Sequence, residues 1–222
     1  MREVIGQLLP LAVVVAISPI PIIGVVLVMV TPRGRTNGPL FVLGFLAGLA
    51  VVGALVLTVA SGLDASSSDS TSSVSGVKLA LGIGLLVIAM RQWRSRPKPG
   101  ETAAMPKWMA AIDSFSPLKV LGTGVLFVAV NPKNLVLTVA AATTVAQSGL
   151  SGADQAIAYG VFALIGTIGV LIPVVISFAM GDRAPAMLAS LKAWMGTHNA
   201  AIMAVICLVI GAKLIGDALP GF

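Results

Sequence analysis

Long apolar stretches recur along the chain and are separated by short polar segments. About 20 helical residues cross the hydrocarbon core of a bilayer, because an α-helix rises about 1.5 Å per residue and the core is about 30 Å thick. The pattern therefore predicts an all-α integral membrane protein with six transmembrane helices. We place these spans at 4–31, 39–61, 75–91, 118–147, 154–179 and 198–218. A stretch at 184–196 carries its apolar residues on one helical face, which predicts a helix lying in the membrane interface.

Composition agrees with this pattern. Of the 222 residues, 57% are apolar and 10% are charged, and the mean hydropathy is +1.03. Soluble domains carry about 25% charged residues, so the composition excludes a soluble domain. The formal charge of +6 comes from basic residues in loops beside apolar stretches, where membrane topology and lipid headgroups explain them. We therefore expect membrane lipids, and no nucleic acid, as partners.

The residue types that most catalytic sites need are scarce. The chain has a single cysteine and a single histidine, which excludes an intrachain disulfide and argues against a zinc or thiol enzyme. The glycines Gly82 and Gly84 lack the context of a phosphate-binding loop and instead predict close contact between helices. We expect no enzymatic activity, no metal and no cofactor.

Lysine and arginine counts predict the orientation in the membrane. Only Arg2, Lys78 and Lys213 fall on the side of the termini. Ten basic residues fall in or beside the loops that follow the first, third and fifth spans: Arg33, Arg35, Arg91, Arg94, Arg96, Lys98, Lys107, Lys119, Arg183 and Lys192. Basic residues are enriched in cytoplasmic loops. The counts therefore predict a multi-pass protein of the cytoplasmic membrane with both termini outside.

Two spans are interrupted near their centres, the first by "AISPIPIIG" (16–24) and the fourth by "VNPKN" (130–134). A proline lacks an N–H donor and clashes with the carbonyl four residues earlier, so it opens a helix. Ser18 and Asn131 directly precede the prolines, and both are good N-cap residues for a helix that restarts with proline. Each span should thus resume as a half-helix whose N-terminus lies near the bilayer midplane. Such an end favours an anion or a polar headgroup.

Lys133 is the one charged residue that we place at membrane depth. A lysine there costs roughly 3 kcal/mol on insertion scales, and no carboxylate lies at a comparable depth in the sequence. A water-filled cavity or an anionic substrate would stabilise it. A proline kink with a lysine that reaches the interface is the simpler alternative, and the sequence leaves it open.

The second half of the chain resembles the first. Ser18-Pro19-Ile20-Pro21 aligns with Asn131-Pro132-Lys133-Asn134 at an offset of 131 − 18 = 113 residues. The stretch that begins at Gly44 aligns with the one that begins at Gly160, at an offset of 160 − 44 = 116. Each unit holds three spans, an odd number, so the second copy must enter the membrane from the opposite side. We predict two inverted three-helix repeats at 1–91 and 118–222, joined by a basic cytoplasmic linker at 92–117, as in many secondary transporters.

These features resemble the GAP-like, or Sap, family of glycolipid- or sulfolipid-addressing proteins, within the lysine-exporter-type (LysE) transporter superfamily. The resemblance is carried by "SPIP" at 18–21, "NPKN" at 131–134, the six spans and the basic central loop. The stretches "TPRGRTNGPLFVLGFLAG" (31–48) and "GIGLLVIAMRQWRSRP" (82–97) are similar to that family too. The resemblance covers nearly the whole chain.

The resemblance implies a protein that helps complex lipids reach the cell surface, beside a larger lipid-export transporter. Carried over residue by residue, it points to substrate-binding positions in both breaks: Ser18, Pro19, Pro21, Asn131, Pro132, Lys133 and Asn134.

Three functions follow from these observations. The first is an exporter or flippase-like protein that moves cell-envelope lipids by alternating access around a midplane site. The second is an exporter of amino acids or other small solutes, driven by an ion gradient, with Asp154 or Asp182 in a vestibule. The third is a non-transporting adaptor that organises a lipid-export complex through the basic stretch 91–108.

Overall fold

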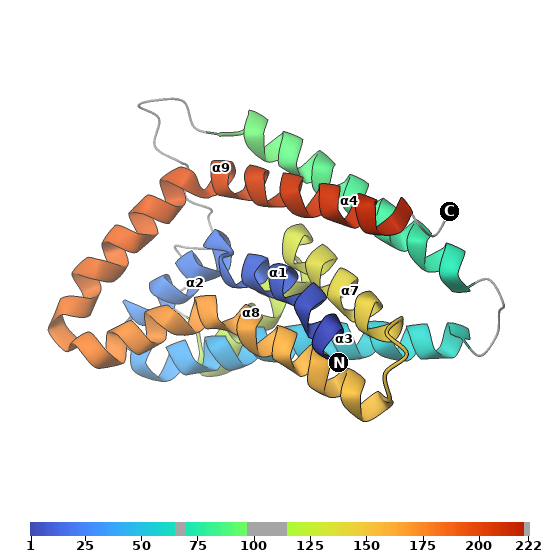
Figure 1. Cartoon of the computed structure of the whole chain (residues 1–222). Coiled ribbons are helices and arrows are strands. Elements are labelled where there is room, and N and C mark those ends of the chain that lie inside the picture. The colour runs from blue at the N-terminus through green and yellow to red at the C-terminus, as the bar shows by residue number, and fades with distance from the viewer. Residues whose placement is uncertain (65–69, 97–114, 220–222) are drawn as a thin grey trace.

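The computed structural model of the chain describes residues 1–64, 70–96 and 115–219, and it contains helices and no strand in these ranges (Figure 1). Most of the predicted linker, 97–114, lies outside the described residues. The helices are α1 (Arg2–Ala16), α2 (Pro19–Met29), α3 (Gly34–Asp64), α4 (Ser70–Arg94), α6 (Pro117–Ala129), α7 (Pro132–Ala146), α8 (Gly152–Met180), the 3₁₀ turn η2 (Gly181–Arg183) and α9 (Ala184–Ala218). The predicted all-α class is confirmed for the described ranges.

Several helical stretches are long and apolar enough to cross a membrane. Among the described residues there are three, Gly34–Val59, Ser75–Arg94 and Gly152–Ala218, and up to five when each bent pair, α1–α2 and α6–α7, counts as one span. Many of their exposed large side chains are apolar, as lipid-facing side chains are: Leu43, Leu55, Val59, Leu164 and Val209 are all more than half exposed. The chain is therefore a multi-pass membrane protein. The count of six spans stays a prediction.

Helix boundaries differ from the predicted ones at two places. Helices α3 and α4 run several residues beyond the predicted spans 39–61 and 75–91, because polar residues do not end a helix outside the hydrocarbon. The stretch 184–196 and the sixth span form one continuous helix, α9, which bends along its length (Figure 1). Gly196, which lies between them, does not end the helix, since a single glycine costs a helix only about 1 kcal/mol.

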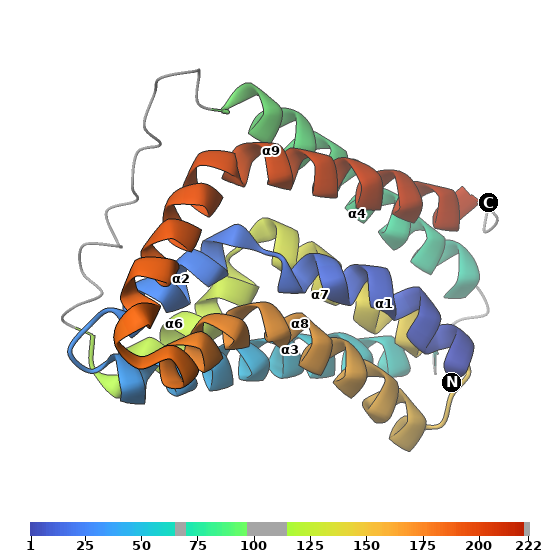
Figure 2. The same cartoon turned by 60° about the vertical axis from the view of Figure 1, so that its left-hand side comes forward.

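The two broken spans lie in the interior of the bundle. Helices α4 and α9 pack side by side along one face, and α3 and α8 lie on the opposite side (Figures 1 and 2). Between these layers run α1–α2 and α6–α7, which contact both of them. This arrangement buries the break in each span against the other half of the chain.

Helices α4 and α9 cross at a pair of glycines. A side-chain carbon added to Gly82 would come within 2.9 Å of the Gly211 carbonyl oxygen, and one added to Gly211 would come equally close to the Gly82 carbonyl oxygen. Small residues at such crossings let two helix backbones approach. A side-chain carbon added to Gly84 would meet no neighbouring atom within 4 Å. The predicted role in close helix contact thus holds for Gly82 and not for Gly84.

We expect Gly82→Ala to lower the free energy of unfolding by about 1–3 kcal/mol, the usual cost of overpacking a tight contact. The added methyl group has to push the backbone of α9 away. Gly84→Ala is the matched control, and it should be neutral or stabilise the helix by up to about 1 kcal/mol, since alanine favours helix more than glycine does. Denaturant unfolding of the purified protein in micelles measures both. Equal stability of the two variants would contradict the crossing.

Two further helix pairs approach even more closely. Gly44 of α3 lies directly against the carbonyl of Leu121 in α6, and Gly169 of α8 lies directly against the carbonyl of Ala16 in α1. A side-chain carbon at either glycine would overlap the facing oxygen. Gly160, which aligns with Gly44 in the sequence, has open space instead. The helix pairs α3–α6 and α8–α1 therefore pack alike, although their glycines do not correspond one to one.

Candidate functional site

The first break leaves the backbone carbonyl of Val14 without a partner in its own helix. Helix α1 ends at Ala16, α2 begins at Pro19, and the two are bent by 50°. In a continuous helix the N–H of Ser18 would donate to the carbonyl of Val14, four residues earlier. Instead it donates to the carbonyl of Val15, at 3.2 Å. The carbonyl of Val14 therefore needs a donor from elsewhere in the protein.

The second break has a capped restart. Helix α6 ends at Ala129, α7 begins at Pro132, and the bend between them is 71°. The side-chain oxygen of Asn131 accepts a hydrogen bond from the N–H of Lys133, at 3.2 Å, as an N-cap does. The predicted restarts at both prolines are confirmed. Ser18, by contrast, does not cap α2 with its side chain.

The two breaks meet through Ser18 and Asn134. The hydroxyl of Ser18 donates to Oδ1 of Asn134 at 2.9 Å, across 116 residues of sequence. Both side chains are buried, Ser18 at 1% exposure and Asn134 at 0%. The amide nitrogen of Asn134 also donates to the carbonyl of Phe127 in α6, at 3.2 Å. Asn134 therefore ties the start of α2 to the second break.

Lys133 reaches across to the first break. Its Nζ atom donates to the carbonyl of Val14 at 2.6 Å, and its side chain is fully buried. Val14 lies in the last turn of α1, where the helix dipole favours a positive charge. Among the buried side chains that the structure describes, Lys133 is the charged one. In this conformation a backbone carbonyl stabilises the lysine, where the sequence led us to expect a cavity or a substrate.

The two carbonyls occupy equivalent places in the chain. Val14 precedes Phe127 by 127 − 14 = 113 residues, the same offset that relates Ser18 to Asn131. Val14 lies four residues before Ser18, and Phe127 lies four residues before Asn131. Their carbonyls accept hydrogen bonds from Lys133 and Asn134, which are adjacent in the second break. Sequence reasoning missed both carbonyls, because a backbone group has no residue signature. Counting four residues back from each break, the span of one helical hydrogen bond, would have found them.

The predicted site residues divide into three groups. Ser18, Lys133 and Asn134, with the carbonyls of Val14 and Phe127, form what we call the break junction. Asn131 holds the start of α7 beside it. The prolines shape the breaks and offer no polar atom beyond the backbone carbonyl: Pro19 and Pro21 are buried, and Pro132 is exposed.

The two aspartates that the ion-gradient hypothesis named lie at the ends of α8. Asp154 accepts a hydrogen bond from the Ser151 hydroxyl at 3.0 Å, in the capped first turn of that helix. Asp182 is exposed in η2. Neither belongs to the break junction.

Comparison with known families decides where this fold belongs. The sequence model of the Sap family, the sulfolipid-1-addressing proteins, matches residues 8–219. The chain belongs to this family. The match includes both breaks, so the Sap family resemblance seen in "SPIP" and "NPKN" is confirmed over nearly the whole chain. No curated protein and no solved structure matches the chain.

Proposed function

We propose that this chain is a membrane exporter of the flippase type, which assists the passage of complex cell-envelope lipids across the cytoplasmic membrane. Glycolipids and sulfolipids are the substrate class, since the Sap family is described as sulfolipid-addressing. A larger lipid-export transporter is the partner that the family resemblance suggests. The protein acts without enzymatic chemistry of its own.

The observation that carries this proposal is the break junction. Two opened spans from opposite halves of the chain meet around a buried lysine, and their hydrogen bonds run between the halves. Broken helices with exposed half-helix N-termini are a common way for secondary transporters to bind a polar or anionic group in the membrane. In hydrocarbon, opened backbone is tolerated only where protein packs against it or where it lines a cavity. The junction meets the first of these conditions in the present conformation.

The proposed architecture has six spans in two inverted three-helix repeats, with both termini outside. The 67 residues of Gly152–Ala218 would be about 100 Å long as one straight helix, over three times the hydrocarbon thickness, so we assign two crossings to them. The repeat is supported by packing: α3 lies on α6 as α8 lies on α1, and α4 lies on α9. Those are the pairings that exchange of the two halves would produce.

Alternating access would work by separating the junction. Lys133 and Asn134 have no exposed surface in this conformation, so a substrate reaches them only after the breaks move apart. An anionic headgroup would then replace the Val14 carbonyl as the partner of the Lys133 ammonium, with the half-helix N-terminus of α7 beside it. The acyl chains would leave sideways between helices into the bilayer. Re-forming the Ser18–Asn134 and Lys133–Val14 bonds would return the protein to the closed state.

Reconstitution of the purified chain alone tests the proposal. We expect liposomes that contain it to move a fluorescent sulfated galactolipid between leaflets faster than empty liposomes do, measured by chemical quenching of the outer leaflet. A neutral galactolipid with the same label is the control for headgroup choice. Efflux of radiolabelled amino acids without lipid movement would instead favour the small-solute exporter. Movement of neither substrate would overturn transport by this chain and favour the adaptor.

A further inference from the structure

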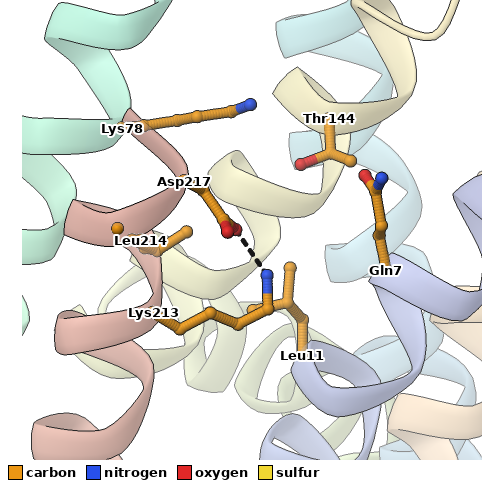
Figure 3. Close-up of a pocket in the computed structure, with 8 residues that line it drawn as sticks. Gln7, Leu11, Lys78, Thr144, Lys213, Leu214 and Asp217 are labelled. Atoms are coloured by element: carbon orange, nitrogen blue, oxygen red, sulfur yellow. Dashed lines mark hydrogen bonds and ion pairs between the residues drawn. The ribbon is translucent and has the colours of Figure 1, made fainter. Parts of the chain in front are cut away.

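A polar pocket of about 350 Å³ lies away from the break junction, between α1, α4, α7 and α9 (Figure 3). Small-ligand pockets run from about 300 to 1,000 Å³, so this one can hold a sugar-sized group. Its lining comes from four helices and from both halves of the chain: Gln7, Leu11, Lys78, Thr144, Lys213, Leu214, Gly216 and Asp217. None of these residues belongs to the break junction.

The position of the pocket follows from helix geometry. Gln7 precedes Ser18 by 11 residues, and Thr144 follows Asn131 by 13 residues, which correspond to about 16 and 20 Å of helix. Half the thickness of the hydrocarbon core is about 15 Å. If the junction lies at the midplane, as the sequence predicts, the pocket lies at a membrane surface. It is on the side of the N-terminus, the predicted outer side.

Two lysines give this pocket a net positive charge. Lys213 pairs with Asp217, one helical turn further along α9. Lys78 of α4 is partly buried, and within the described part of the chain it forms no hydrogen bond and no ion pair. Lys78 and Lys213 are also two of the three basic residues that the sequence places on the outer side. That side is normally poor in basic residues, so their meeting in one pocket points to an anionic ligand.

The Lys213–Asp217 pair is poorly suited to stabilising the helix. A basic residue four positions before an acidic one is the weaker order of such pairs, and a carboxylate in the last turn opposes the helix dipole. Both side chains are partly exposed, at 34% and 44%, and pairs of this kind contribute little to stability. Asp217 can therefore keep Lys213 beside Lys78 before a ligand binds. A ligand that binds Lys213 more strongly can replace the carboxylate.

The uncharged residues indicate what is attached to that anion. Figure 3 shows Gln7 and Thr144 across the pocket from the charged side chains. The Thr144 hydroxyl donates to the carbonyl of Ala140 at 2.9 Å, so its oxygen is left to accept. The Gln7 amide can both donate and accept. These groups suit the hydroxyls of a sugar, while Leu11 and Leu214, each 2% exposed, form an apolar wall.

We propose that this pocket binds the sulfated or phosphorylated sugar headgroup of a membrane lipid. Lys78 and Lys213 hold the oxyanion between them, and Gln7 and Thr144 contact sugar hydroxyls. Its place in export, as an outer site that receives the headgroup after the break junction, rests on the proposed function. Binding itself does not depend on transport. A free sulfate or phosphate ion shares the oxyanion chemistry, but it has no hydroxyls for Gln7 and Thr144.

Lipid binding to the full chain in nanodiscs tests this proposal by native mass spectrometry. The probes are a sulfated galactosylceramide and the same lipid without sulfate. We expect the wild type to prefer the sulfated lipid, and the Lys78→Met/Lys213→Met variant to lose that preference by about tenfold. Asp217→Asn should keep the preference or strengthen it, because it removes the competing carboxylate. Lys119→Met, on the exposed start of α6, is the control and should bind as the wild type does.

Three outcomes would overturn the proposal. The first is equal binding of the two lipids by the wild type, and the second is an unchanged preference in the double-lysine variant. The third is displacement of the sulfated lipid by inorganic sulfate at equal concentration, which would assign the pocket to a free anion. Binding is measured without transport, so this experiment stays separate from the proposed function. If liposomes with the wild type move no lipid while the preference in nanodiscs persists, the proposed function fails and the pocket stands.

Discussion

Lipid movement by the Lys133→Met variant is expected to fall about 10- to 100-fold, while the protein still folds and inserts. The ammonium would bind the headgroup once the breaks separate, and a hydrogen bond to a charged group contributes about 1.5–3 kcal/mol, which corresponds to that range of rates. Methionine has a similar length and no charge. It leaves the Val14 carbonyl without its Lys133 donor but also removes a buried charge, and these two effects on stability oppose each other.

Initial rates of lipid movement in liposomes measure this effect, and thermal unfolding in micelles checks that the variant is folded. Lys119→Met is again the matched control, since it removes a lysine from the same half of the chain at an exposed position. Wild-type rates in Lys133→Met would exclude Lys133 from the transport path. A fall of the same size in Lys119→Met would show that the loss reflects overall charge.

Asn134→Leu is expected to lower the free energy of unfolding by about 1–3 kcal/mol. The substitution keeps the side chain's size and removes two buried hydrogen bonds, to the hydroxyl of Ser18 and to the carbonyl of Phe127. Hydrogen bonds between membrane helices contribute about 0.6 kcal/mol on average and up to about 1.7. Unfolding in mixed micelles, followed by circular dichroism, measures the change.

A double-mutant cycle with Ser18→Ala separates the contribution of the Ser18–Asn134 hydrogen bond from the other effects of Asn134→Leu. If Ser18 and Asn134 bond directly, the two changes should be non-additive by about 0.5–2 kcal/mol. The second bond of Asn134, to Phe127, stays outside this coupling because Ser18 takes no part in it. Additive effects would mean that the Ser18–Asn134 contact contributes nothing to stability.

Local signals account for the part of this fold that could be predicted from the sequence. The breaks follow from proline chemistry, and Ser18 and Asn131 mark their ends because each precedes a proline. The helices follow from the length of their apolar stretches. The start of α9 at Ala184 agrees with the predicted helix 184–196. Its continuity was missed because 184–196 was assigned to the interface and 198–218 to a separate span.

The partners within the site could not be predicted in the same way. Two N-cap residues in equivalent positions behave differently: Asn131 caps its own helix, and Ser18 bonds to Asn134 across the bundle. A short polar side chain can cap its own helix or bond to another helix. The residues that the other half of the chain places beside it decide between the two. The pocket between α1, α4, α7 and α9 is similar, since only the spacing of Lys213 and Asp217 is visible in the sequence. Lys78 joins them because α4 packs on α9.

The bonds of the break junction also constrain how the protein is made. The Val14 carbonyl receives its donor from a residue 119 positions later, and ribosomes add about 5–20 residues each second. The first broken span therefore exists for about 6 to 24 s before Lys133 has been synthesised. During that interval the opened backbone of Val14 must be satisfied by water, lipid headgroups or the insertion machinery. The first broken span can thus reach its final hydrogen bonding only after Lys133, in the second broken span, has been inserted.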